Sequence, residues 1–195
     1  MKNIFKISVL LFIGLSFVVS SCKKEEVLID GCTDGSAMNY ASDANSDDGS
    51  CVFAYDLAQG KWNIDPTCDS VGFKIFGQVV YTLDVASIFP STSDISGNSQ
   101  NVISLEINSD SLGIEESFLA DVTNNGIITL RDNQSFDIDG IEVPDFGSLN
   151  MTVKLSGSGN IDISNTGTLA LQLEFVPSIA LLSTESSTCQ IIFIR

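Results

Sequence analysis

Apolar residues recur at every second position along most of the chain after residue 70. Successive side chains of a β-strand point to opposite faces, so a period of two marks a strand with one buried face. The clearest runs are Val71/Phe73/Ile75, Val79/Tyr81/Leu83, Ile103/Leu105/Ile107, Leu149/Met151/Val153/Leu155 with a continuation to Ile161 and Ile163, Leu169/Leu171/Leu173/Phe175, and Cys189/Ile191/Phe193. Shorter candidates cover 118–122, 127–131 and 135–138. We therefore expect residues 56–195 to form one all-β domain of eight or nine strands.

Turn-forming residues separate these runs and keep the connections short. They are Asn124-Asn125-Gly126, Asp139-Gly140, Ser156-Gly157-Ser158-Gly159 and Asn165-Thr166-Gly167. Helix signals are few, and residues 84–90 predict one short helical turn before Pro90. Short connections between sequential strands predict an antiparallel up-and-down meander. Such a sheet hides its edges by closing into a barrel, with a two-sheet β-sandwich as the alternative.

A Gly-Lys-Trp triplet stands where the first strand of this domain is expected. Gly60-Lys61-Trp62 resembles the Gly-x-Trp signature on the first strand of lipocalins. The resemblance implies a lipocalin-like barrel in which Trp62 plugs the closed end. It also implies a binding module for a small apolar ligand or a glycan, although Leu, Ile and Phe in many strands are large enough to fill such an interior.

The N-terminus has the order of a secretory signal. Lys2 and Lys6 give a basic start, residues 7–19 are apolar, and small residues precede Cys22. Thirteen residues of helix span only about 20 Å, whereas a transmembrane helix must cross about 30 Å of hydrocarbon. We therefore predict a signal peptide over residues 1–21.

The residues around the predicted cleavage point carry a second resemblance. Val19-Ser20-Ser21-Cys22 resembles the bacterial lipobox, which implies that the Cys22 sulfur is acylated and that the chain is cut before it. Residues 22–31 then form a lipidated tether. Its charged start, Lys23-Lys24-Glu25-Glu26, resembles the surface-export signal of Bacteroidota lipoproteins. That resemblance implies an outer-membrane protein anchored by lipid at the cell surface, with the periplasmic face of the membrane as the alternative.

The chain has five cysteines, and four remain for disulfides if Cys22 is lipidated. The other four would meet an oxidising compartment and allow three pairings. We predict Cys32–Cys51, which closes a loop inside one small module, and Cys68–Cys189, which ties the start of the β-domain to its last strand.

The residues between the tether and the β-domain, 32–55, form a small acidic module. Its Gly-Cys-Thr-Asp start at residue 31 and Asp-Asp-Gly-Ser-Cys end at residue 51 resemble a short repeat of bacterial surface and secreted proteins. The repeat supports the Cys32–Cys51 bridge and a surface location. Oxygen ligands of the kind calcium prefers are also concentrated here; the candidates are Asp34, Asp43, Asn45, Asp47 and Asp48. The alternative is a solvated loop whose Asp and Asn side chains cap its own turns.

Charge and composition exclude several classes of function. The chain has no histidine and a net charge of −16, which becomes −18 when Lys2 and Lys6 leave with the signal peptide. That charge repels nucleic acid, and the absence of imidazole removes the commonest general base and metal ligand. A carboxylate-pair glycosidase needs two acids at a suitable separation, and the obvious pairs are Glu115-Glu116 and Asp137/Asp139. We expect a non-enzymatic protein with a structural or interaction role in the envelope.

Overall fold

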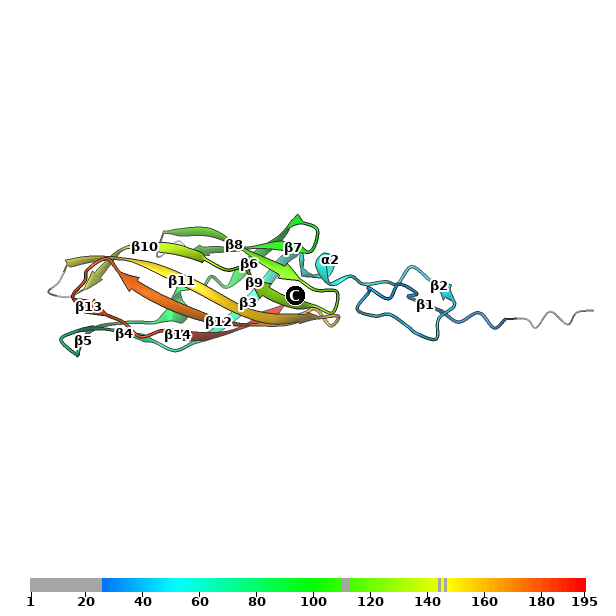
Figure 1. Ribbon diagram of the computed structural model, residues 1–195, viewed down its shortest axis with the longest axis horizontal. Coiled ribbons are helices and arrows are strands. Elements are labelled where there is room, and N and C mark those ends of the chain that lie inside the picture. Colours follow the sequence, from blue (N-terminus) through cyan, green and yellow to red (C-terminus); the bar gives the residue numbers. More distant parts are fainter. Residues whose placement is uncertain (1–25, 110–112, 144, 146) are drawn as a thin grey trace, which may run out of the picture.

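The computed structural model describes residues 26–109, 113–143, 145 and 147–195. The predicted signal peptide and Cys22 lie outside the described residues. The described chain is an elongated body in which a small N-terminal module leads into a long β-barrel (Figure 1). The module holds β1 (Asp30–Gly31) paired with β2 (Ser46–Asp47). A short helix, α2 (Ala54–Ala58), connects it to the barrel, and Ala54 and Ala58 are both buried in the barrel core.

Within the described residues, eight strands form a closed antiparallel barrel. In order around the barrel they are β3 (Gly60–Cys68), β6 (Thr92–Ser99), β7 (Val102–Ser109), β8 (Ile114–Val122), β9 (Ile127–Leu130), β11 (Gly147–Asp162), β12 (Thr166–Pro177) and β14 (Ser187–Ile194). Each strand pairs with the next one in this order, and β14 returns to pair with β3. The predicted up-and-down meander and its closure into a barrel are therefore confirmed.

The remaining elements extend one end of this barrel. A separate three-stranded sheet joins β13 (Leu182–Ser183), β4 (Val71–Ile75) and β5 (Gln78–Leu83) at the pole opposite the module (Figure 1). The β10 strand (Gln134–Val143) continues along β11 beyond β9. Between β8 and β10, which do not pair with each other, the Gln134 side chain donates to the Leu119 carbonyl at 2.8 Å and accepts from the Leu119 N–H, so it substitutes for a strand pairing.

The disulfide between Cys68 and Cys189 lies on the seam between the first and last barrel strands. The two residues are direct partners in the β3–β14 register, and Ile191 faces Pro66 two positions further along. The seam is thus closed by hydrogen bonds and by a covalent bond. Cys32–Cys51 closes the module, so both predicted disulfides are confirmed.

Period-two alternation locates the core correctly, and it fails at one strand. On β12 the residues Leu169, Leu171 and Leu173 are buried while their neighbours face outward. The barrel strand that the sequence did not predict is β6, because its inward positions carry Ser93 and Gly97 as well as Ile95. Gly97 leaves room for the helix above it, since an added Cβ would lie 2.2 Å from the Tyr55 hydroxyl oxygen.

Two predicted turns are wrong. Residues 156–159 lie in the interior of β11 and pair with β12 without a break. Gly157 and Gly159 take inward positions where the sheet bends so tightly that a Cβ at Gly159 would lie 1.8 Å from the Thr168 carbonyl oxygen. Asp139-Gly140 is a β-bulge in β10, where the register with β11 shifts between Ile138 and Ile141. The predicted helical turn is confirmed as the 3-10 helix η1 (Val85–Ile88).

The tight bend at Gly159 makes a first prediction. Gly159→Ala should destabilise the barrel by about 2–3 kcal/mol, because the added methyl group forces the β11 and β12 backbones apart. The matched control is Gly72→Ala on β4, where the nearest atom would lie 3.5 Å away, an ordinary contact. Urea unfolding of both variants measures the difference. Equal stability of the two variants would contradict the close approach of β11 and β12.

Candidate functional site

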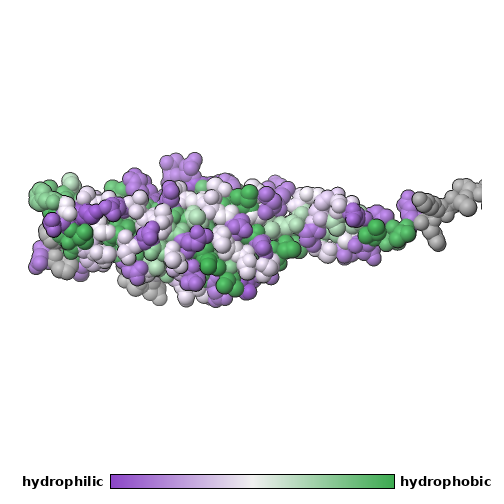
Figure 2. Space-filling model, turned by 90° about the horizontal axis from the view of Figure 1, so that it is seen from below, coloured by the Kyte–Doolittle hydropathy of each residue, from purple (hydrophilic) through white to green (hydrophobic). Residues whose placement is uncertain are grey.

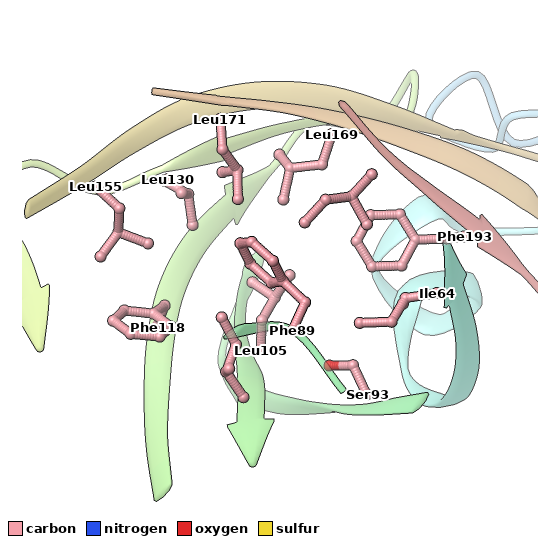
Figure 3. Close-up of a pocket in the computed structure, with 12 residues that line it drawn as sticks. Ile64, Phe89, Ser93, Leu105, Phe118, Leu130, Leu155, Leu169, Leu171 and Phe193 are labelled. Carbon is pink, nitrogen blue, oxygen red and sulfur yellow. The ribbon is translucent and has the colours of Figure 1, made fainter. Parts of the chain in front are cut away.

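The barrel interior is the place where a lipocalin-like protein would hold a ligand, and here it is almost completely filled. A cavity of about 30 Å³ remains, which is room for only one or two water-sized spheres. Figure 3 shows the side chains that surround it pointing toward one another from several strands. They are Ile64, Phe89, Ser93, Leu105, Ile107, Phe118, Leu130, Leu155, Leu169, Leu171, Ile191 and Phe193.

A segment of the chain itself takes up much of the interior. The residues around η1 fold inward after β5, and Val85 and Ile88 have no exposed surface. The next residue, Phe89, extends its ring among the cavity side chains (Figure 3). Ser93 is the one polar residue of the lining, and its hydroxyl donates to the Glu106 carbonyl at 2.7 Å. The interior therefore offers a ligand apolar contact but neither space nor a free polar group.

Trp62 closes the end of the barrel that faces the module. Its side chain is fully buried, and the indole Nε1–H donates to the Ala58 carbonyl at 2.8 Å. The ring meets Phe193 edge to face with centroids 6.3 Å apart, and the Arg195 guanidinium carbon lies 4.2 Å from the ring centroid. Arg195 also donates to the carbonyl of Gln59, the residue that follows α2, and so helps to hold α2 against this end of the barrel.

The acidic module is built from turns that its own side chains cap. Asp34 accepts from the Ser36 N–H at 2.8 Å, Asp47 from the Gly49 N–H at 3.1 Å, and Asp48 from the Ser50 N–H at 2.9 Å. The Ser36 hydroxyl, followed by the Ser36 N–H, lowers the pKa of Asp34 because both bonds favour the charged carboxylate. The Ser50 side chain and backbone lower the pKa of Asp48 for the same reason.

The five predicted calcium ligands do not converge on a common point. Over the part of the chain that the structure describes, no group of three or more Asp, Glu, Cys or His side chains is placed to hold a metal ion. Asp43 faces the Ser42 hydroxyl at 3.3 Å, and Asn45 has both of its polar atoms occupied by the backbone. Calcium binding stays a prediction of the sequence, which calorimetric titration of the mature chain with Ca²⁺ tests.

Asn45 holds the incoming chain against the module. Its Oδ1 accepts from the Ile29 N–H at 2.9 Å, and its Nδ2 donates to the Val27 carbonyl at 3.0 Å. The Asn45 backbone N–H also donates to the Ile29 carbonyl at 3.0 Å. These bonds fix residues 27–29 although the side chains of all three are exposed.

The Asn45 clamp makes a second prediction. Asn45→Ala should raise amide hydrogen exchange at Ile29 by about fivefold, because losing one such bond costs on the order of 1 kcal/mol. Asn45→Asp is the matched control, since it keeps the oxygen acceptor for the Ile29 N–H and removes only the donor to Val27. Unchanged exchange in the alanine variant would show that the clamp does not order the tether.

The carboxylate pairs that we weighed for chemistry lie on the outer surface. Glu115 and Glu116 are exposed on β8. Asp137 and Asp139 are exposed on β10, and Asp137 accepts from the Thr152 hydroxyl at 2.6 Å. Open depressions of about 460 Å³ each cross the outer faces of β11, β12 and β14. Their linings include the polar side chains Ser156, Gln172 and Thr188.

Comparisons with known proteins add no family to this description. A scan against protein-family models, a search of curated proteins and a search of solved structures each found no match. Among the described residues, no helix is both long and apolar enough to cross a bilayer.

The structure reveals two features that sequence reasoning missed. Phe89 lies in the segment predicted as a helical turn, where period-two alternation says nothing about the direction of its ring. Phe76 and Gly77 form the two-residue turn between β4 and β5, and Phe76 is 90% exposed. A residue followed by Gly between two alternating runs is a hairpin signal that could have located this turn.

Proposed function

We propose that this protein is a lipid-anchored, non-enzymatic interaction protein of the bacterial outer envelope, displayed at the cell surface. Cys22 carries the lipid, residues 22–31 tether it, and the module holds the barrel away from the membrane. The barrel acts through its outer surface and contacts another envelope component. Nucleic acid is not a partner of so acidic a chain.

The observation that carries this proposal is the filled barrel. Ligand pockets in proteins usually measure about 300–1,000 Å³, whereas the interior cavity here measures about 30 Å³. Our alternative, a lipocalin-like binding module for a small apolar ligand or a glycan, would need an interior that opens. An exterior role requires no change in the fold.

The arrangement of the two ends supports an anchored display. The described chain begins at one pole of the elongated body, and the β4–β5 hairpin lies at the other (Figure 1). A lipid attached four residues before residue 26 would place the hairpin at the pole far from the membrane. The Asn45 clamp and the Cys32–Cys51 bridge stiffen the module, which connects the tether to the barrel.

Replacing the lipidated residue tests the anchor. Cys22→Ser should move the protein from the membrane fraction to the soluble fraction, because no acyl chain can then be attached. The control is Cys68→Ala/Cys189→Ala, which removes cysteines without touching the anchor and should stay membrane-bound. Surface biotinylation of intact cells then separates display at the cell surface from the periplasmic face. Membrane retention of the Cys22→Ser variant would contradict the proposal.

A further inference from the structure

The hairpin at the pole far from the module carries the most exposed aromatic side chain among the described residues. Phe76 is 90% exposed and has a φ of 50°, and Gly77 follows with a φ of 83°. Two residues with positive φ between paired strands form the turn that Asn-Gly favours. A bulky aromatic residue in the left-handed region destabilises the fold, and here its ring makes no compensating contact with the core cluster.

Apolar side chains surround this turn, and charge is absent from it. Leu182 pairs with Ile75, which brings Leu181, 66% exposed, beside the turn. Val79 is 55% exposed on the other strand of the hairpin. Figure 2 shows apolar surface at this pole. Residues 75–83 and 176–184 contain no Asp, Glu, Lys or Arg in a chain whose net charge is −16.

The β5 strand also has an unpaired edge. In the described part of the chain it pairs with β4 alone, and no lysine or proline protects its outer side. Free backbone N–H and C=O groups on such an edge accept another extended strand. A lipid surface cannot satisfy them, because hydrocarbon offers no hydrogen bonds. The ligand that fits this edge is therefore a protein strand.

We propose that the β5 edge and the Phe76 turn bind the same edge and turn of a second copy of this chain. The proposal deepens the proposed function, since it names the partner of the exterior surface. A self-contact elsewhere on so acidic a chain brings carboxylates together. The Phe76 turn and β5, residues 75–83, contain none, and the neighbouring carboxylate of Glu185 is already paired with Lys74. The strand also suits itself, because Val79, Val80 and Tyr81 are residues that pair well across strands.

The symmetry of such a pair fixes its geometry. When two copies use the same edge, a two-fold axis relates them and the β5 strands run antiparallel. The hairpin lies roughly along the long axis of the molecule (Figure 1). The two bodies therefore point in opposite directions, with their modules at the far ends. For anchored chains this arrangement joins two facing membranes, and the small contact area makes the pair weak and reversible.

Sedimentation velocity of the mature chain, residues 22–195 with Cys22→Ser, tests the proposal. We expect a reversible monomer–dimer equilibrium over about 10–500 µM, the range of a small interface. X-ray scattering should give the dimer a maximum dimension well above that of the monomer. A monomer at every concentration, or a dimer no longer than the monomer, would overturn the proposal. The test uses unlipidated protein, so it stands even if the anchor proposal fails.

Variants at the pole identify the interface. Phe76→Asn should weaken the dimer at least tenfold while raising Tm by about 2–4 °C, because Asn suits the positive φ of the turn. A purely structural role for Phe76 would instead lower Tm. Val79→Lys should also weaken the dimer, because lysine on an edge strand blocks pairing. The matched control is Ile163→Lys, 56% exposed in the β11–β12 turn, which should leave the dimer unchanged. A dimer insensitive to both hairpin variants would overturn the proposal.

Discussion

Trp62→Ala should destabilise the protein by about 3–5 kcal/mol, the usual cost of removing a large aromatic side chain from a core. The indole is fully buried between α2 and the end of the barrel, and its ring supports both Phe193 and Arg195. Without it, α2 loses its hydrogen-bonded contact and the barrel end opens to water. Urea unfolding followed by circular dichroism measures the loss, since the chain has no other tryptophan to report by fluorescence.

Two matched variants separate the parts of this effect. Trp62→Phe keeps a ring but leaves the Ala58 carbonyl without its donor, and should cost about 1–3 kcal/mol. Lys61→Ala, at the exposed neighbouring position of β3, should change stability by less than about 0.5 kcal/mol. A loss below about 1 kcal/mol for Trp62→Ala would mean that the residue does not close the barrel.

Phe89→Ala should have an effect of similar size and should also create a binding site. The ring lies among the side chains of the barrel interior, so its removal costs about 3–5 kcal/mol and leaves a larger apolar cavity. Such cavities stay dry and bind benzene-sized molecules. Benzene should therefore raise Tm of the variant and leave that of the wild-type protein unchanged.

Phe76→Ala is the matched control for this substitution, because its ring is 90% exposed and makes no cavity when removed. It should show neither the loss of stability nor the response to benzene. A wild-type protein that already responds to benzene would contradict the filled interior. The function would then have to be sought inside the barrel, in the lipocalin-like binding alternative.

Much of the fold follows from alternation and from cysteine positions. Runs such as Leu169/Leu171/Leu173 have one buried face in the structure as predicted, and Cys68 and Cys189 stand opposite each other on the seam that closes the barrel. The wrong turn prediction on β11 has a clear physical cause. Gly157 and Gly159 are common in turns, yet here they allow two strand backbones to approach closely, and that need is visible only in three dimensions.

The candidate site was harder to predict than the fold. The resemblance of Gly60-Lys61-Trp62 to lipocalins correctly placed Trp62 at the closed end of a barrel, but it could not show that the interior is filled. Phe89 fills the interior from a segment that has no alternation of apolar and polar residues. The sequence therefore contained no sign that its ring points into the barrel. The acidic side chains of the module cap local turns. An Asp- and Asn-rich sequence is typical both of capped turns and of calcium sites, so the sequence alone did not distinguish the two.

The state of the mature N-terminus decides whether this protein is a lipid-anchored envelope protein. Intact-mass and peptide mass spectrometry of the protein purified from bacterial membranes would define that end of the chain. The account predicts a chain that starts at Cys22, lacks residues 1–21, and carries acyl chains on that cysteine. A chain that retains residues 1–21, or that begins with an unmodified Cys22, would contradict the anchored envelope protein proposed here.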